Sequence, residues 1–174
     1  MLLSFKTANS VDSAAVYSLI RNIYEQTPYF SDKFDHKYPT THSFKNAVEN
    51  LFSISGSHFD LIYVDSKMAG YFQIERRTEN NLAHTGYLNM GILPQFQGMK
   101  LGRELLQRAW SLIESEKYLE ILYLMVRSDN EPAIKLYRSS GFEDVAVLKN
   151  DTKTSDGRYY DGILMRKYTK NFKQ

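Results

Sequence analysis

The sequence contains no cysteine and only four histidines, and both scarcities exclude kinds of chemistry. Without cysteine there is no disulfide, no thiolate metal ligand and no cysteine nucleophile. The histidines show no close ligand spacing, so we expect no metal site; they are His36, His42, His58 and His84. Since nothing in the chain demands oxidising conditions and its first residues are no secretory signal, we expect a cytoplasmic protein.

Long apolar runs and a strong excess of either charge are also missing. No run approaches the about 20 residues that a membrane-spanning helix needs, so we expect no association with a membrane. The formal net charge of +2 is too small for a dedicated nucleic-acid binder, which concentrates basic residues on one face or tail. With 174 residues, 43% of them hydrophobic, the chain is expected to form one domain, residues 1–174, with its own core.

Hydrophobic periodicity predicts a mixed α/β domain with its elements in the order β-α-α-β-β-β-α-β-α-β-β. Ser10 or Asp12 is suited to cap the first helix, and Thr41 precedes the second. Residues 26–40 are predicted to be an irregular loop with one helical turn. The run 121–126 is apolar on both faces, as in a buried central strand. The remaining elements are expected as strands near 2–7, 59–64, 68–76, 84–93, 142–148 and 159–166, a long helix near 98–116 and a short one from 130 to 141.

A short segment between a predicted strand and the long predicted helix has the composition of an anion site. A strand, a glycine-bearing turn and a helix in that order leave backbone N–H groups unpaired, and the helix dipole adds positive potential. The segment lacks the endings and spacings of a nucleotide P-loop or a dinucleotide site. By itself it is equally consistent with a tight turn that holds no ligand. Its residues are Gln97, Gly98, Met99, Lys100, Leu101 and Gly102.

A second segment, about one strand downstream, suggests what the first one holds. Asn130 is suited to cap a short helix, with Pro132 in the first turn and Gly141 after its end. Tyr137 follows Asn130 by about two helical turns, so the two residues lie on nearly the same face. A tyrosine hydroxyl there can enter a cleft as a proton donor. For either residue alone, the alternative is a simple cap and a core tyrosine.

Together, the two segments resemble the GNAT superfamily of N-acetyltransferases. The family motif Gln/Arg-x-x-Gly-x-Gly/Ala matches residues 97–102 at its first and last positions. The segment 156–165 also looks like the ending of members that acetylate small amines or protein N-termini. The resemblance covers residues 59–168 well and the preceding residues by element order only. The family pattern Asn-x-x-Ala-x-x-x-Tyr-x-x-x-Gly-Phe matches without gaps at Asn130, Ala133, Tyr137, Gly141 and Phe142.

The resemblance implies a fold and a co-substrate. It implies a mostly antiparallel, twisted sheet of about six to seven strands with a splayed parallel pair, flanked by about four helices. It also implies that acetyl-CoA binds as co-substrate, with its pyrophosphate on the backbone amides of residues 97–102. The pantetheine arm would lie in the gap between the strand that ends near Leu93 and the strand that ends near Val126.

The same resemblance implies roles for single residues. Backbone groups of Gly91 and Ile92 would bond the pantetheine arm and orient the thioester carbonyl, whose developing oxyanion needs a donor. Asn130 would contact the pantetheine, and Tyr137 would protonate the departing thiolate. A neutral amine would attack the thioester directly, so no covalent enzyme intermediate is needed.

One departure from the family and one open question concern single residues. Lys100 stands where the family has its middle glycine, and its side chain either crowds the pyrophosphate, points away or adds a charge-assisted contact. We expect binding to be retained, because the donor is a backbone N–H that lysine also has. For the general base, the candidates are Glu75, His84 and, through a water molecule, Asn89. The alternative is a surface or structural role for His84 and Glu75.

The acceptor site and the function remain open between alternatives. Aromatic faces beside carboxylates suit a cationic amine, although a surface loop with inward-facing aromatics is equally consistent. The leading hypothesis is an N-acetyltransferase that acts on a small-molecule amine, an amino acid, a polyamine or a peptide N-terminus. The alternatives are a non-catalytic acyl-CoA-binding or sensing module and an anion-binding structural domain. The resemblance also allows a homodimer through the last strands. The acceptor-site candidates are Tyr24, Tyr29, Phe30, Asp32, Phe34, Asp35 and Tyr38.

Overall fold

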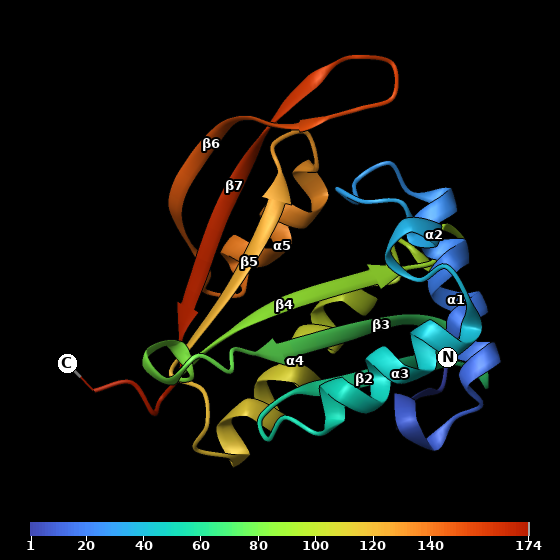
Figure 1. Cartoon of the computed structure of the whole chain (residues 1–174), viewed down its shortest axis with the longest axis horizontal. Coiled ribbons are helices and arrows are strands. Elements are labelled where there is room, and N and C mark those ends of the chain that lie inside the picture. Colours follow the sequence, from blue (N-terminus) through green and yellow to red (C-terminus); the bar gives the residue numbers. More distant parts are fainter. Residues whose placement is uncertain (174) are drawn as a thin grey trace.

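The computed structural model describes residues 1–173 and is built around one seven-stranded sheet, shown in Figure 1. The strands lie in the order β1-β2-β3-β4-β5-β7-β6, and β4 and β5 are the parallel neighbours in an otherwise antiparallel sheet. This arrangement confirms the predicted fold class. The strands are β1 (Leu3–Thr7), β2 (His58–Val64), β3 (Lys67–Arg76), β4 (Thr85–Ile92), β5 (Ile121–Arg127), β6 (Glu143–Lys153) and β7 (Tyr159–Tyr168).

Five α-helices connect the strands within the described residues. The predicted cap of the first helix is Asp12, whose carboxylate accepts from the Ala15 N–H, and Thr40 caps the third. The helix count exceeds the expected four because the helical turn predicted inside residues 26–40 is an α-helix of its own. The helices are α1 (Ser13–Gln26), α2 (Phe34–Lys37), α3 (Thr41–Phe52), α4 (Leu101–Ser115) and α5 (Glu131–Ser139). None in residues 1–173 is long and apolar enough to cross a membrane.

Alternate residues of the strands send their side chains into two separate cores on opposite faces of the sheet. Leu61 and Tyr71 belong to the core under α1 and α3. Ile62 and Phe72, their neighbours in sequence, belong to the core under α4 and α5. Figure 1 shows α3 in front of the strands and α4 behind them. The sheet is therefore a middle layer, and a gap in it is reached from either side.

The parallel pair separates after a short stretch, as the resemblance implied. β4 and β5 are paired at three positions, which end at Tyr87 and Tyr123. Beyond them, β4 stays with β3 as far as Ile92 and β5 stays with β7 as far as Arg127. In Figure 1 the two strands diverge like the arms of a V. The inner backbone edges of both arms are thus left without a strand partner.

Three local differences from the sequence predictions have physical causes. β5 is not buried on both faces, because no helix covers its front; Met125 is 44% exposed. α4 begins at Leu101 and not near residue 98, because Lys100 has a left-handed backbone conformation that cannot belong to the helix. β6 runs on to Lys153, past the predicted end near residue 148, through an irregularity in its pairing with β7.

Candidate active site

The gap between β4 and β5 forms a cleft of about 1050 Å³ that reaches from the start of α4 to the β6–β7 hairpin. It collects residues that lie far apart in the sequence, and most of the predicted site residues are among them. The predicted residues that line it are Asn89, Gly91, Ile92, Gln97, Gly98, Lys100, Leu101, Gly102, Asn130 and Tyr137. Met99 lies beside the cleft and packs against the core under α4.

At one end of the cleft, the turn before α4 has the backbone of an anion site. Gly98 has φ 78° and Lys100 has φ 63°, so two left-handed residues turn the chain just before the helix. No side chain caps the start of α4, which leaves its first amides available to a ligand. A Cβ on Gly98 would meet nothing, so the space above the turn is open. Lys100, Arg103 and Lys135 line the same end and add positive charge.

Two glycines let the walls of the cleft come close. A Cβ on Gly102 would stand 2.6 Å from Leu136 Cδ2, so its absence allows α4 to approach α5. A Cβ on Gly91 would stand 2.7 Å from Ile23 Cγ2, so its absence allows α1 to approach β4. Cβ atoms do not come this close to other atoms in proteins without a shift. The motif glycine at position 102 therefore serves the packing of α4 against α5.

Tyr137 is held in the cleft by α5, which begins where the sequence predicted. The Asn130 side chain accepts a hydrogen bond from the Ala133 N–H at 3.4 Å and so caps the helix, with Pro132 in the first turn. Tyr137 is buried and its ring meets the Phe142 ring edge-on, with centroids 5.8 Å apart. Burial raises the pKa of the Tyr137 hydroxyl well above its ordinary value. The phenol therefore keeps its proton at neutral pH and is able to donate it.

The other end of the cleft is lined by part of the aromatic loop after α1. Tyr29 and Phe30 line the cleft, and Tyr24 stacks on Phe30 with centroids 3.8 Å apart. Phe34 is buried and belongs to the core, and burial raises the pKa of Tyr38 to about 12. The loop is thus divided: its first aromatics face the cleft and its later ones fill the core. The carboxylates of this loop, Asp32 and Asp35, are exposed and are not among the cleft-lining residues.

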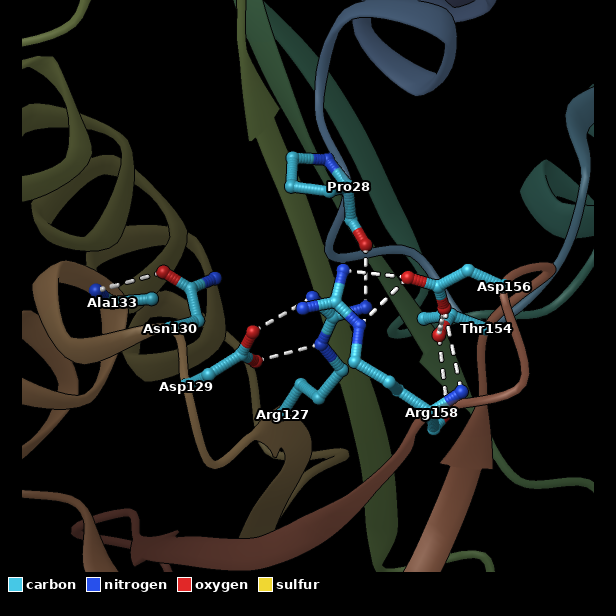
Figure 2. A network of polar contacts seen from close by, with 8 residues as sticks. All are labelled: Pro28, Arg127, Asp129, Asn130, Ala133, Thr154, Asp156 and Arg158. Atoms are coloured by element: carbon cyan, nitrogen blue, oxygen red, sulfur yellow. Dashed lines mark hydrogen bonds and ion pairs between the residues drawn. The ribbon is translucent and has the colours of Figure 1, made fainter.

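A buried arginine that sequence reasoning missed lies at the mouth of the cleft, where Figure 2 shows its contacts. Arg127 is only 7% exposed, and its guanidinium donates to both carboxylate oxygens of Asp129, at 2.6 and 2.8 Å. It also donates to the Pro28 carbonyl at 2.6 Å and lies over the rings of Tyr160 and Tyr29. The arginine lowers the pKa of Asp129 through this hydrogen bonding. Arg127 therefore joins β5, β7 and the loop after α1.

The candidates for the general base lie in different places. Asn89 lines the cleft and accepts a hydrogen bond from the Tyr71 hydroxyl at 2.9 Å. His84 lies at the closed end of the V, where its carbonyl accepts from the Glu120 N–H at 2.8 Å. Glu75 is an exposed residue of β3. Neither His84 nor Glu75 is among the described residues that line the cleft.

Comparison with known proteins agrees with this geometry. Residues 17–142 match the model of a family described as the Acetyltransferase (GNAT) family. The [Ribosomal protein bS18]-alanine N-acetyltransferase of Escherichia coli (strain K12) is 38% identical over 77 residues, which are 44% of this chain and 51% of that protein. An N-alpha-acetyltransferase of Sulfurisphaera tokodaii is 30% identical over 120 residues, 64% of this chain and 71% of that protein. The chain spans about half the length of the first of these relatives.

Solved structures share the fold over nearly the whole chain. An acetyltransferase of the GNAT family from Streptococcus pneumoniae has a TM-score of 0.89 at 23% identity and covers 96% of this chain and 99% of its own. A GNAT superfamily phosphinothricin acetyltransferase from Sinorhizobium meliloti, solved in complex with acetyl-CoA, has a TM-score of 0.85 at 15% identity. That match covers 99% of this chain and 93% of its own. At these identities the likeness concerns the fold alone.

Proposed function

Because the chain belongs to the acetyltransferase (GNAT) family, we propose that it transfers the acetyl group of acetyl-CoA to a primary amine, and that its acceptor is a peptide N-terminus. The observation that carries the proposal is the splayed gap, which has an uncapped helix start at one end and the buried Tyr137 hydroxyl in its wall. The relatives named for N-alpha or alanine acetylation support the peptide acceptor. We further propose that residues 1–174 form one domain.

The residues at the start of α4 fit the phosphates of acetyl-CoA. Gly98 is open above its Cα and the first turn of α4 has no side-chain cap, so an anion can approach the amides directly. Beyond Tyr87, β4 has no strand partner on the side of the gap, and Gly91 and Ile92 belong to this stretch, whose backbone we expect to bond the amides of the pantetheine arm. When bound, acetyl-CoA supplies a thioester that a neutral amine can attack.

Within this arrangement, Tyr137 acts as the general acid. Its pKa is raised by burial, so the hydroxyl is protonated whenever the acceptor amine is reactive. The hydroxyl gives its proton to the sulfur that departs, and it is restored by the proton that the new amide nitrogen must lose. Gly91 lets α1 approach β4, and Gly102 lets α4 approach α5, the helix that carries Tyr137. This close packing keeps Tyr137 and the backbone of β4 on facing walls of the gap.

An exposed sheet face in front of the gap favours a long acceptor over a small enclosed one. Tyr87 is 45% exposed on β4 and Met125 is 44% exposed on β5, and neither is covered by a helix. In Figure 1 the gap between β4 and β5 opens between the loop after α1 and the β6–β7 hairpin. A peptide can lie across such a face and present its first amine to the gap, which a closed pocket would not allow.

The test compares the wild-type protein with Tyr137→Phe, using acetyl-CoA, peptides with a free N-terminus, and small amines. We expect CoA release with the peptides and a loss of kcat of about 100-fold or more in the variant, the size that general acid catalysis contributes. Acetyl-CoA should raise the unfolding temperature of both proteins. Binding without turnover on any amine, and no effect of the variant, would favour a non-catalytic acyl-CoA-binding module. The cytoplasmic location and the homodimer stay predictions.

A further inference from the structure

The β6–β7 hairpin contains a bulge beside the cleft. From the pair Leu148–Gly162 to the pair Thr152–Tyr160, β6 advances four residues and β7 advances two, so β6 carries two extra residues. Bulges re-aim side chains and are frequent next to active sites. Asn150 has φ 54°, and the Asp161 carboxylate accepts from the backbone N–H of Asn150 at 3.0 Å. The bulge is thus held by a specific contact, and Asp151, which lies within it, lines the cleft.

Gly162 makes room for the Asp151 carboxylate. A Cβ on Gly162 would stand 2.6 Å from Asp151 Oδ2 and 3.0 Å from Met125 Sδ. The carboxylate and the thioether therefore both lie over this glycine, on the exposed front of β5 and β7. Since Gly162 is paired with Arg127 and Leu164 with Met125, these residues share one face of the sheet. A side chain at position 162 would force the Asp151 carboxylate to shift from this position.

Asp151 differs from the other carboxylates of the hairpin because no side chain in residues 1–173 forms an ion pair or a hydrogen bond with its carboxylate. Asp161 is bonded by Lys149 at 2.7 Å and Asp156 by Arg158 at 2.6 Å. Asp151 has no ion pair and no hydrogen bond from a described side chain, and it is the one acidic side chain among the described residues that line the cleft. The other charge nearby, Arg127, is already paired with Asp129.

The charges in the cleft are therefore separated along its length. Lys100 and Arg103 line the cleft at the start of α4 and Lys135 lines it from α5, whereas Asp151 lines it from β6. Tyr137 belongs to the core under α4 and α5, whereas Asp151 lies on the front face. In the proposed function, Tyr137 is the acid beside the co-substrate, and Asp151 is the anion on the front face. The space between them suits an acceptor amine, which is a cation until it loses a proton.

We propose that Asp151 binds the ammonium group of the acceptor amine and thereby selects acceptors with a free, positively charged N-terminus. The inference rests on the proposed function. The ammonium group donates hydrogen bonds to the carboxylate, a charge-assisted contact. It then gives one proton to solvent at this exposed end of the cleft, and the neutral nitrogen attacks the thioester carbon. Asp151 is thus a specificity-determining residue, and an acceptor whose nitrogen is already acylated lacks the charge that it recognises.

The experiment measures binding, so that it does not depend on turnover. A hexapeptide that begins with alanine is titrated, free or N-acetylated, into the protein saturated with CoA, for the wild type, Asp151→Asn and Asp151→Glu. The matched control is Glu143→Gln, which removes a carboxylate on the same strand that does not line the cleft. We expect the wild type and the control to prefer the free peptide by about 10-fold or more, the size of one charge-assisted hydrogen bond.

In Asp151→Asn the preference should fall to about threefold or less, and Asp151→Glu should keep part of it. Added salt should weaken binding of the free peptide to the wild type and have little effect on the asparagine variant. Equal binding of both peptides to the wild type, no binding of either, or an unchanged preference in Asp151→Asn would overturn the proposal. A wild type that prefers the free peptide in this titration, yet releases no CoA when acetyl-CoA and the same peptide are supplied, would refute the enzymatic function and leave the assignment of Asp151 standing.

Discussion

Replacing Lys100 by glycine tests the account of the anion turn, because its outcome follows from one backbone angle. Lys100 has φ 63°, in the left-handed region, and it precedes the first residue of α4 without capping it. A side chain in this region costs about 1–2 kcal/mol relative to glycine. Glycine gains about 0.5–1 kcal/mol of freedom in the unfolded chain, which offsets part of the benefit.

The net expectation for Lys100→Gly is an increase of about 0.5–1 kcal/mol in the free energy of unfolding, which raises Tm by about 1–4 °C in a chain of this length. The matched control is Lys135→Gly, which changes an exposed lysine at the same end of the cleft but inside α5. A helical position loses about 1 kcal/mol with glycine. The two substitutions should therefore shift the denaturant midpoint in opposite directions.

Lys100→Gly also tests whether the backbone amides of the turn or the Lys100 ammonium group bind the CoA phosphates. If the backbone amides of the turn bind them, CoA should bind Lys100→Gly within about threefold of the wild-type affinity, as calorimetry would show. If the Lys100 ammonium contributes a charge-assisted bond, the loss should be about 10-fold or more. A Lys100→Gly protein that is less stable than the wild type would refute the argument from the left-handed backbone, whatever its affinity.

Three further predictions follow from contacts around the cleft. Gly102→Ala should lower the free energy of unfolding by about 1 kcal/mol, because overpacking against Leu136 outweighs the better helix propensity of alanine. When Leu136 is also replaced by alanine, Gly102→Ala should no longer lower the free energy of unfolding measured from denaturant curves. Arg127→Met should lower stability by about 2 kcal/mol and speed proteolysis next to Pro28, since it removes the bonds to that carbonyl and to Asp129. The folded-state pKa of Asp129 lies below its unfolded value. Its stabilising effect is therefore complete above about pH 4 and lost as the pH falls further, and the difference in unfolding free energy between wild type and Arg127→Met should shrink on acidification.

Local rules were sufficient for much of the fold. The spacing of apolar residues, which differs between helices and strands, predicted the order of the elements. The caps at Asp12 and Asn130 lie where short polar side chains precede apolar stripes. The site residues carried by the two motifs also come together in one cleft, because both motifs stand at helix starts beside the splayed strands. These features depend on a few consecutive residues, which is why a single sequence was enough.

What the sequence did not reveal depends on contacts between distant segments. Arg127 follows the apolar run 121–126, and nothing in that run indicates that it is buried, because its burial depends on contacts such as the one with Pro28, which lies 99 residues earlier. Asp151 lies between the strands predicted near 142–148 and 159–166, and only the count of paired residues on β6 and β7 reveals the bulge that contains it. The left-handed angle of Lys100 was equally invisible, because the family glycine that would have signalled it is absent.

The width of the gap is fixed at both ends, and this gives Arg127 a role beyond stability. At the closed end, β4 and β5 are paired up to Tyr87 and Tyr123, whose rings lie 5.8 Å apart. At the open end, Arg127 is the last residue of β5, and it donates to the carbonyl of Pro28, which follows α1 (Figure 2). Because α1 packs on β3 and β4, this bond links the two arms of the V across its mouth. Loss of the guanidinium should therefore widen the gap and raise the KM for the acceptor before it changes the binding of the CoA phosphates at the start of α4.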